Sequence, residues 1–440
     1  MNIIIESYGC TANSNDAEII AGILEKSGYT VLFSNATKQK CDLPILNTCV
    51  VKGPTLKRME RRIKDLLEAY NKLIVCGCMV TAYYDRIMEI KEKIEKKFGK
   101  RHIALIPPDN IKDIAKVVKE IEKRDVILIN KKGKEKVGLA KRKINRVIGI
   151  TQIASGCASS CSFCITKLVK GHIKSYSIDK IIASIKQDLR EGCKEIWLTA
   201  TDTGCYGIDK GKYMLVDLLK KIIEIKGRFW LRVGMMNPEH TKHYIDDLLE
   251  IYESKKVFKF LHLPLQSGSN NVLKEMKRKH NVEDFLEIVN KFRKRFPDAT
   301  LATDIIVGFY NETDSDFKET IKIVKKVKPE IINISRFWPM PKTLAFKKSK
   351  HRLKEIEEIA KGRSKKLMEI AKKIALEKNK KLIGKNLLVL VDKKGYGNSF
   401  LARDINYKLI AIKEKAMLGK FYKVEIKEAK SNFVIGKIKN

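Results

Sequence analysis

Three cysteines, Cys157, Cys161 and Cys164, stand in C-x3-C-x2-C spacing within eight residues. The loop around them is rich in glycine and serine and follows a short apolar run at residues 147–150. Such a loop can wrap a metal centre but cannot fill a core. Thiolates are soft ligands that suit iron–sulfur clusters or zinc. A four-iron cluster on three thiolates leaves one iron open to a substrate, whereas three thiolates around zinc with an open position describe a catalytic zinc.

A second set of thiols, Cys10, Cys49 and Cys78, is spread over the N-terminal part of the chain. Each comes after a short apolar run that reads as a strand, at residues 2–5, 43–46 and 73–76. In an open α/β sheet the carboxyl ends of parallel strands face one crevice where ligands bind. We therefore expect these thiols to converge into a second three-thiolate site.

The four remaining cysteines receive no role. Cys76 lies inside a strand and reads as a core thiol, and Cys41 lies in a polar loop and reads as a surface thiol. Cys193 and Cys205 are left unassigned. In a chain without a secretory signal, ten cysteines are better explained by metal or redox chemistry than by structural disulfides.

Residues 1–125 read as alternating strands and helices, which predicts an α/β domain with an open parallel sheet. Further strands are expected at residues 30–33 and 103–106. One helix is expected from about Asn15 to Gly28, where glycine suits a left-handed cap, and another begins near Pro54. Residues 126–145 are basic and read as a linker strand and loop between domains.

Residues 146–380 are expected to form the central domain. Six apolar runs with helical stretches between them predict a partial (β/α)6 barrel, at residues 147–150, 195–198, 229–233, 258–263, 301–307 and 331–337. Active residues of such folds lie at the carboxyl ends of the strands. The polar segments there are 199–204, 235–239, 264–269, 308–313 and 338–343, and they should face one cavity with the cysteine loop. An amphipathic helix at 350–380 packs back on the protein.

Residues 381–440 change character. Short β-branched runs at 387–391, 408–412, 422–426 and 433–435 are separated by glycine turns, which predicts a small antiparallel β-barrel. This segment has 14 Lys or Arg against 5 Asp or Glu, so an RNA-binding module is favoured.

The whole chain is strongly basic, with 90 Lys plus Arg against 52 Asp plus Glu and a formal charge of +38. That balance favours a polyanionic partner such as nucleic acid, although a lysine-rich proteome also produces it. We expect a cytoplasmic protein without membrane attachment, because the N-terminus lacks a signal sequence and no apolar run reaches membrane-spanning length. The chain also lacks a P-loop, a dinucleotide fingerprint and a His-Glu-x-x-His motif. His240 and His262, near strand ends, are interpreted as packed or solvent-linked histidines.

The cysteine loop, with Phe163 before its third cysteine, resembles the signature of radical S-adenosylmethionine (SAM) enzymes. Segments 7–16, 47–52 and 76–79 are similar to the N-terminal domain of methylthiotransferases, and the C-terminal region around segment 403–407 resembles a TRAM domain, an RNA-binding β-barrel. The three blocks occur in the family's order and cover essentially the whole chain. The resemblance implies that Cys157, Cys161 and Cys164 hold the SAM-cleaving 4Fe–4S cluster, and that Cys10, Cys49 and Cys78 hold an auxiliary 4Fe–4S cluster.

Within that family, segments 166–167, 202–207, 236–238 and 303–306 look most like the archaeal and eukaryotic branch, whose members add a methylthio group to N6-threonylcarbamoyladenosine in tRNA. The chain departs from its relatives at segment 339–344 and at Leu168-Val169-Lys170, where an Ala-Arg pair is usual. The residues expected to contact SAM lie in the cysteine loop, in the segments after strands, or within the predicted strand 301–307, and they are Phe163, Thr201, Asp202, Gln266, Ser267 and Asp304.

The expected activity is therefore methylthiolation of C2 of N6-threonylcarbamoyladenosine at tRNA position 37, with two SAM molecules, by a monomer that takes electrons from a donor such as ferredoxin or flavodoxin. The anticodon stem-loop is the expected partner, since its loop bases are single-stranded and open to stacking. Three alternatives stay open. They are methylthiolation of isopentenyladenosine in tRNA, methylthiolation of a ribosomal protein, and a zinc-stabilised RNA-binding protein without catalysis. A basic ribosomal protein would be repelled by the basic C-terminal module.

Overall fold

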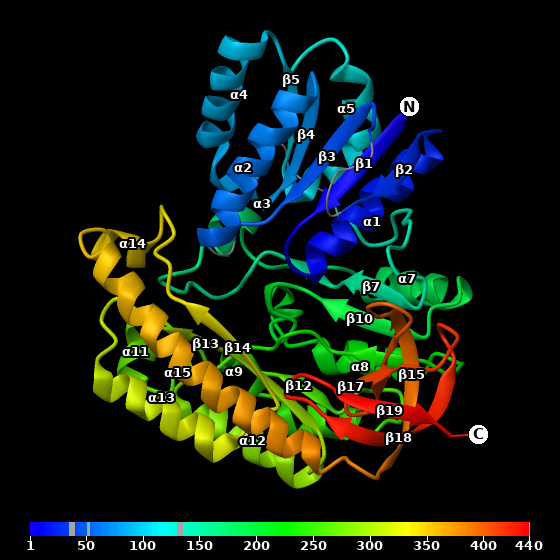
Figure 1. The fold of residues 1–440 in the computed structure, drawn as a ribbon, viewed down its shortest axis with the longest axis vertical. Coiled ribbons are helices and arrows are strands. Elements are labelled where there is room, and N and C mark those ends of the chain that lie inside the picture. The colour runs from blue at the N-terminus through cyan, green and yellow to red at the C-terminus, as the bar shows by residue number, and fades with distance from the viewer. Residues whose placement is uncertain (35–39, 51–52, 130–134, 440) are drawn as a thin grey trace. The chain divides into compact units, whose positions relative to one another are not determined.

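The computed structural model describes residues 1–34, 40–50, 53–129 and 135–439 (Figure 1). Residues 51–52 of the segment 47–52 and residues 130–134 of the linker 126–145 lie outside the described residues. The chain divides into two compact units. The first comprises Met1–Ile144, Ile150–Cys157 and Cys164–Ser184, and the second comprises Asn145–Gly149, Ala158–Phe163 and Ile185–Asn440.

The first unit is built on a six-stranded parallel sheet in the order β2-β1-β3-β4-β5-β6, with helices along it (Figure 1). Its strands are β1 (Asn2–Ser7), β2 (Thr30–Phe33), β3 (Leu43–Thr48), β4 (Lys72–Gly77), β5 (His102–Ile106) and β6 (Val126–Ile127). Its helices are α1 (Thr11–Lys26), α2 (Gly53–Ala69), α3 (Cys78–Ala82), α4 (Tyr84–Phe98), the 3-10 turn η1 (Pro108–Asp113) and α5 (Ile114–Glu120). The predicted open parallel sheet is confirmed. Strand β6, expected in the linker, pairs with β5 and extends the sheet.

Helix α1 begins at Thr11, four residues before the start at Asn15 that the sequence predicted. The polar residues at its start obscured the boundary because they are buried rather than exposed. The Asn13 amide, for instance, donates to the Thr48 carbonyl at 2.8 Å and so ties the helix start to the end of β3. Beyond the helix, Gly28 has φ +85°, the left-handed conformation expected after a helix end.

Between α5 and the central strands, the first unit also contains a short hairpin, β8 (Ala154–Ser155) with β9 (Lys174–Ser175), and helix α6 (Thr166–Lys170). Strand β7 (Ile148–Gln152) spans the division between the units, and helix α7 (Ile178–Arg190) does so as well.

The six expected barrel strands form two parallel sheets, β11-β10-β7 and β12-β13-β14. Besides β7 they are β10 (Glu195–Thr199), β11 (Trp230–Arg232), β12 (Phe260–His262), β13 (Thr300–Val307) and β14 (Ile331–Arg336). The two sheets are connected where Phe258 N donates to the Leu231 carbonyl at 3.0 Å. The predicted partial barrel of six strands is confirmed.

The helices of this barrel are α8 (Leu215–Ile223), α9 (Pro238–Thr241), α10 (Ile245–Tyr252), α11 (Asn270–Glu275), α12 (Val282–Arg295), α13 (Asp314–Val327), α14 (Leu344–Ser349) and α15 (Leu353–Lys380), with the turn η2 (Ile208–Lys210). Capping boxes fix the starts of α12, through Asn281 and Asp284, and of α13, through Thr313 and Asp316. Helix α15 lies along β13 and β14, as Figure 1 shows, and buries Leu367 against them. The predicted amphipathic helix is thereby confirmed.

The C-terminal segment forms a closed five-stranded barrel in the order β15-β16-β17-β19-β18. The strands are β15 (Asn386–Lys394), β16 (Phe400–Asp404), β17 (Leu409–Ile412), β18 (Phe421–Ala429) and β19 (Val434–Ile438). The predicted antiparallel barrel is confirmed in four of its five strand pairs, and β17 and β19 run parallel where the barrel closes. Strand β16 had no signal in the sequence, because it is short and ends in the charged pair Arg403-Asp404.

The small barrel packs against the N-terminal ends of the central strands. The Trp230 ring, at the start of β11, meets the Phe421 ring edge-on with centroids 4.9 Å apart. The Phe260 ring, at the start of β12, lies 4.5 Å from the Tyr407 ring. These aromatic contacts lie away from the carboxyl ends of the strands.

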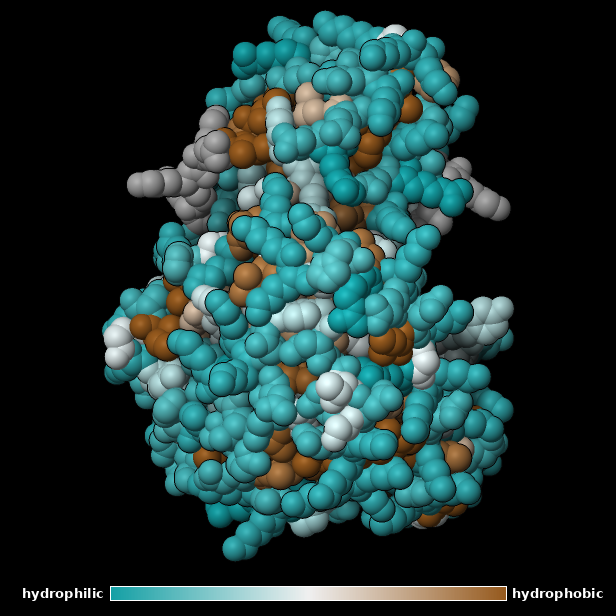
Figure 2. Space-filling view, turned by 90° about the vertical axis from the view of Figure 1, so that its left-hand side faces the viewer, coloured by the Kyte–Doolittle hydropathy of each residue, from teal (hydrophilic) through white to brown (hydrophobic). Residues whose placement is uncertain are grey.

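The molecular face in Figure 2 is mostly hydrophilic, with hydrophobic residues in small separate groups. Within the described ranges, no helix is long and apolar enough to cross a membrane.

Candidate active site

The structure brings Cys10, Cys49 and Cys78 together within the first unit. They come directly after β1, β3 and β4, which are neighbours in the sheet, so the strand ends that precede them lie side by side. Burial raises the pKa of the Cys78 thiol to about 12; Lys170 opposes this rise, and the neighbouring Cys49 and Cys10 add to it. The predicted convergence of the three thiols is therefore present in the fold.

The turn before Cys10 is shaped around Cys49. Gly9 has φ +123°, and a Cβ there would stand 2.7 Å from the Cys49 Cβ and 3.0 Å from its sulfur. Only glycine fits this backbone position without displacing the thiol. A closely packed set of three thiols is a suitable donor set for an iron–sulfur cluster.

Lys170, at the end of α6, is the positive charge beside these thiols. Burial alone opposes its charged form, but the neighbouring Cys78, Cys10, Asp16 and Cys49 raise the pKa of Lys170 above its usual value. Helix α6 packs against α3, which begins at Cys78. In the sequence, Lys170 differs from its counterparts in relatives, and nothing there predicts its position beside the thiols.

Two other thiols of the first unit behave largely as expected. Cys76 is fully buried in the sheet core, and burial raises the pKa of its thiol. Cys41, expected on the surface, is half-buried, and burial raises the pKa of its thiol too. Neither joins the Cys10, Cys49 and Cys78 set.

Cys157 and Cys164 belong to the first unit. The Cys157 N–H donates to the Gly171 carbonyl at 3.2 Å, and the Thr166 N–H donates to the Cys164 sulfur at 3.4 Å. Gly156 precedes Cys157 with φ +74°, and a Cβ there would lie 1.9 Å from the His172 carbonyl oxygen. The backbone around these two thiols therefore requires glycine at 156.

Cys161 belongs to the second unit, where its sulfur accepts a hydrogen bond from Arg278 Nη1 at 3.2 Å. The next residue, Ser162, donates its hydroxyl to the Glu275 carbonyl at 2.7 Å, which fixes this part of the loop to α11. The Phe163 ring then meets the Phe309 ring edge-on at 6.2 Å. Arg278 was not predicted from the sequence; the basic run 277–279 after α11 was its only signal.

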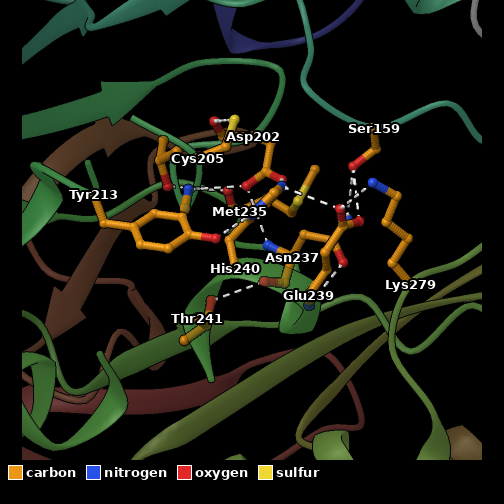
Figure 3. Close-up of polar contacts among 12 residues, drawn as sticks. Ser159, Asp202, Cys205, Tyr213, Met235, Asn237, Glu239, His240, Thr241 and Lys279 are labelled. Carbon is orange, nitrogen blue, oxygen red and sulfur yellow. Dashed lines mark hydrogen bonds and ion pairs between the residues drawn. The ribbon is translucent and has the colours of Figure 1, made fainter. Parts of the chain in front are cut away.

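A polar network links the cysteine loop to two strand ends in the second unit (Figure 3). Ser159 donates to Glu239 Oε2 at 3.0 Å and accepts from the Asn237 amide at 3.4 Å. Asp202 Oδ1 accepts from the Asn237 N–H at 3.1 Å and from the Gly204 N–H at 2.9 Å. The segments after β10 and β11 thus meet, as the barrel geometry predicted.

Behind this network, Asp202 and His240 form a buried pair (Figure 3). Asp202 Oδ2 lies 3.8 Å from His240 Nε2, and the Tyr213 hydroxyl lies 3.3 Å from His240 Nδ1. Burial raises the pKa of Asp202, and the charge of His240 opposes that rise. The interpretation of His240 as a packed histidine is confirmed. Cys205 lies within 4.8 Å of the same two side chains and donates to the Asp202 carbonyl at 3.3 Å.

Of the other residues expected to contact SAM, Thr201, Gln266 and Ser267 follow strand ends, whereas Asp304 lies within β13. Asp304 Oδ2 lies 3.1 Å from His262 Nε2, and Asp304 also accepts from the Asn333 amide. Gln266 takes φ +70° in the loop after β12. Ser267 is fully buried with its hydroxyl 3.4 Å from that of Thr320, so it holds the loop in place. Thr201 is half-buried beside Asp202. Their contacts with SAM stay predictions.

The loop after β13 borders a pocket of about 270 Å³ that residues 308–313 line together with Arg352, Ile356 and Ile359. Glu312 turns its carboxylate inward, where it accepts from the Gly308 N–H at 2.6 Å and from Arg363 at 2.7 Å. This segment, expected to face the substrate cavity, thus anchors α15 through Arg363.

Family comparisons agree with three blocks of the chain. Residues 151–324 match the radical SAM superfamily, residues 2–99 match the uncharacterized protein family UPF0004, and residues 380–439 match the TRAM domain.

Full-length relatives carry one name. The chain is 38% identical to a "Probable threonylcarbamoyladenosine tRNA methylthiotransferase" of Pyrococcus abyssi, over 100% of this chain and 99% of that one. It is 33% identical to the "Threonylcarbamoyladenosine tRNA methylthiotransferase" of Homo sapiens, over 99% of this chain and 73% of the human one.

Among solved structures, the radical SAM methyltransferase TsrM of Kitasatospora setae, with cobalamin and a 4Fe-4S cluster bound, superposes with a TM-score of 0.56 at 12% identity, covering 80% of this chain and 74% of that one. At that identity the likeness concerns the fold alone. The domain order and the full-length relatives together show that this chain belongs to the radical SAM methylthiotransferase family, in the branch of archaeal and eukaryotic members, as the sequence motifs predicted.

Proposed function

We propose that this chain adds a methylthio group to C2 of N6-threonylcarbamoyladenosine, next to the anticodon at tRNA position 37. The observation that carries the proposal is the convergence of Cys10, Cys49 and Cys78 in a chain that also has the radical SAM loop and resembles relatives of that name over its full length. One site would generate the radical, and the other would handle the sulfur.

We assign Cys157, Cys161 and Cys164 to one 4Fe–4S cluster, and Cys10, Cys49 and Cys78 to the other. The donor sets support the assignment, because each offers three thiols and leaves one iron without a protein ligand. When bound, the clusters and SAM supply the radical chemistry that replaces an aromatic C–H bond by C–S, a step for which no acidic proton is available to a general base.

The residues around the cluster assigned to Cys157, Cys161 and Cys164 would prepare that site for the reaction without themselves reacting. Arg278 donates to the Cys161 sulfur, which stabilises negative charge on that ligand. The buried Asp202 carboxylate, held by the Asn237 and Gly204 N–H groups, offers an acceptor to the amino group of SAM. The basic C-terminal barrel would grip RNA phosphate while the nucleotide is splayed out of the anticodon loop.

The enzyme would act as a monomer in the cytoplasm and draw electrons from a low-potential donor such as ferredoxin or flavodoxin.

Two measurements test the proposal. Protein purified without oxygen should carry roughly eight irons per chain, as two four-iron clusters require. A colourless protein that contains zinc instead would contradict the enzyme assignment. Mass spectrometry of tRNA nucleosides from cells lacking the protein should show threonylcarbamoyladenosine without its methylthio group. Loss of the methylthio group from isopentenyladenosine instead would assign the chain to a different substrate.

A further inference from the structure

The connection between β15 and β16 presents an aromatic side chain entirely to solvent. Tyr396 is 100% exposed, with Gly395 and Gly397 on either side. The backbone of this turn is closed, because the Ser399 hydroxyl donates to the Tyr396 carbonyl at 2.7 Å and the Gly395 N–H donates to the Ser399 carbonyl at 2.8 Å. The turn therefore holds the ring outward, where it adds nothing to the core of the barrel.

Two more large apolar side chains lie exposed on the connection between β17 and β18. Met417 is 63% exposed and Leu418 is 44% exposed. This connection reaches the same end of the barrel as Tyr396, because the Gly419 N–H donates to the Val391 carbonyl near the end of β15 at 2.8 Å. The strand register also places both connections at the same end, since Phe400 at the start of β16 pairs with the last residue of β15 and with the last residue of β17. The three exposed apolar side chains thus share one end of the barrel.

Basic side chains surround them. Five exposed lysines lie at this end of the barrel: Lys393 and Lys394 end β15, and Lys413, Lys415 and Lys420 lie on the connection between β17 and β18, which has one acidic residue, Glu414. Lysines attract a polyanion, and exposed apolar and aromatic faces take up bases that are not paired. Three apolar side chains among five cations are too few for a stable protein interface, which buries about 800 Å² on each partner. The chemistry fits a nucleic acid with unpaired bases.

From this arrangement we infer that the barrel end defined by Tyr396, Met417, Leu418 and the five lysines is an RNA-binding surface, on which an unpaired base stacks on the Tyr396 ring while the lysines contact phosphates. The inference rests on the proposed function in one respect, that tRNA is the substrate. It goes further by naming the surface and the side chain that bind the RNA.

The first experiment measures the affinity of the full-length protein for unmodified tRNA by fluorescence anisotropy. Tyr396→Ala should weaken binding about tenfold, because stacking on one aromatic ring contributes on that scale. Tyr396→Phe keeps the ring and should bind like the unchanged protein. The matched control is Ile383→Ala, which removes a side chain that is 50% exposed near the start of β15, at the other end of the barrel. Equal weakening by Tyr396→Phe and Tyr396→Ala, or by the control, would overturn the inference.

A second experiment compares two double charge reversals. Lys393→Glu with Lys394→Glu should lower affinity and flatten its dependence on salt, because phosphate contacts release counterions. Lys381→Glu with Lys385→Glu changes the net charge equally but lies before β15, and it should keep the salt dependence of the unchanged protein. If both pairs reduce the salt dependence alike, binding depends on net charge and not on this surface, and the inference fails.

SAM cleavage without tRNA separates this inference from the proposed function. Tyr396→Ala should cleave SAM at the normal rate. If the unchanged protein cleaves SAM but Tyr396→Ala still binds tRNA normally, the barrel-end surface is wrong and the proposed function stands. If the unchanged protein does not cleave SAM, yet binds tRNA through Tyr396, the proposed function fails and the surface stands. Binding to phosphatidylserine vesicles that requires Tyr396, with unchanged tRNA affinity, would also overturn the surface.

Discussion

Arg278 Nη1 donates to the Cys161 sulfur at 3.2 Å, across 117 residues of sequence, and Arg278 Nη2 donates to the Asn237 amide oxygen at 2.6 Å. One planar side chain therefore connects a proposed cluster ligand to the strand-end network that also holds Asp202. Hydrogen bonds to ligand sulfurs are among the factors that set the reduction potential of an iron–sulfur cluster.

Replacing Arg278 should therefore make the proposed first cluster harder to reduce. Arg278→Lys keeps the charge but loses the two-pronged donor, and we expect a more negative reduction potential and roughly tenfold slower SAM cleavage. Potentiometric titration combined with electron paramagnetic resonance measures the first quantity. Lys274→Ala, on the exposed face of α11, is the control. An unchanged potential in Arg278→Lys would show that this hydrogen bond does not tune the cluster.

The two cysteine sets should have separable roles. Cys161→Ala should abolish SAM cleavage, whereas Cys49→Ala should still cleave SAM but fail to insert sulfur into tRNA. Cys41→Ala, outside both sets, should keep both reactions and the full iron content. Counting deoxyadenosine and methylthiolated nucleoside in the same reaction distinguishes these outcomes. Equal loss of both reactions in Cys49→Ala would contradict separate roles.

Lys170 should influence the proposed auxiliary cluster through its charge, since it lies beside Cys10, Cys49 and Cys78. In Lys170→Gln the positive charge is gone, so adding an electron costs more and the reduction potential of that cluster should become more negative. The measurement is a redox titration in a Cys161→Ala background, in which only the auxiliary cluster is expected to assemble. Lys174→Gln, exposed on β9, is the matched charge control. Equal shifts in the two variants would indicate a long-range charge effect alone.

Glu195 should make the folded state less stable as the pH rises. Burial, and then the charge of Asp392, raise the pKa of Glu195 to about 7, and burial raises the pKa of Asp392 to about 6. The protonated Glu195 and Asp392 side chains contribute their full stability to the fold below the unfolded-state pKa, which is near 4.5 for Glu195. This contribution is lost as the pH rises through about 7. For Glu195 this amounts to on the order of 3 kcal/mol.

Glu195→Gln removes that titration. Calorimetry at pH 5 and pH 8 measures how far the melting temperature of Glu195→Gln lies above that of the unchanged protein. This difference should be larger at pH 8 than at pH 5. Glu224→Gln, on the exposed surface, should show no such difference. A stability gain for Glu195→Gln that is the same at pH 5 and pH 8 would argue against a raised pKa.

The sequence by itself determined most elements of the fold and the two cysteine sets. Short-range patterns encode these features, because apolar runs select strands, helical spacing of apolar residues selects helices, and three thiols in a short loop of small and polar residues can surround one metal centre. The convergence of Cys10, Cys49 and Cys78 was also predictable, since neighbouring parallel strands bring the residues at their carboxyl ends to one edge of the sheet.

Only the tertiary structure decided which distant side chains meet these sites. Arg278 at Cys161, Lys170 beside the second set, and Glu195 buried near Asp392 depend on how helices and barrels pack, and no local pattern specifies that packing. The small barrel shows the same limit, because β16 forms through pairing with β15 and β17 rather than through its own residue preferences. Local spacing thus predicted two sets of metal-binding thiols and the family resemblance implied their chemistry, while long-range packing set the charges and hydrogen bonds that would tune it.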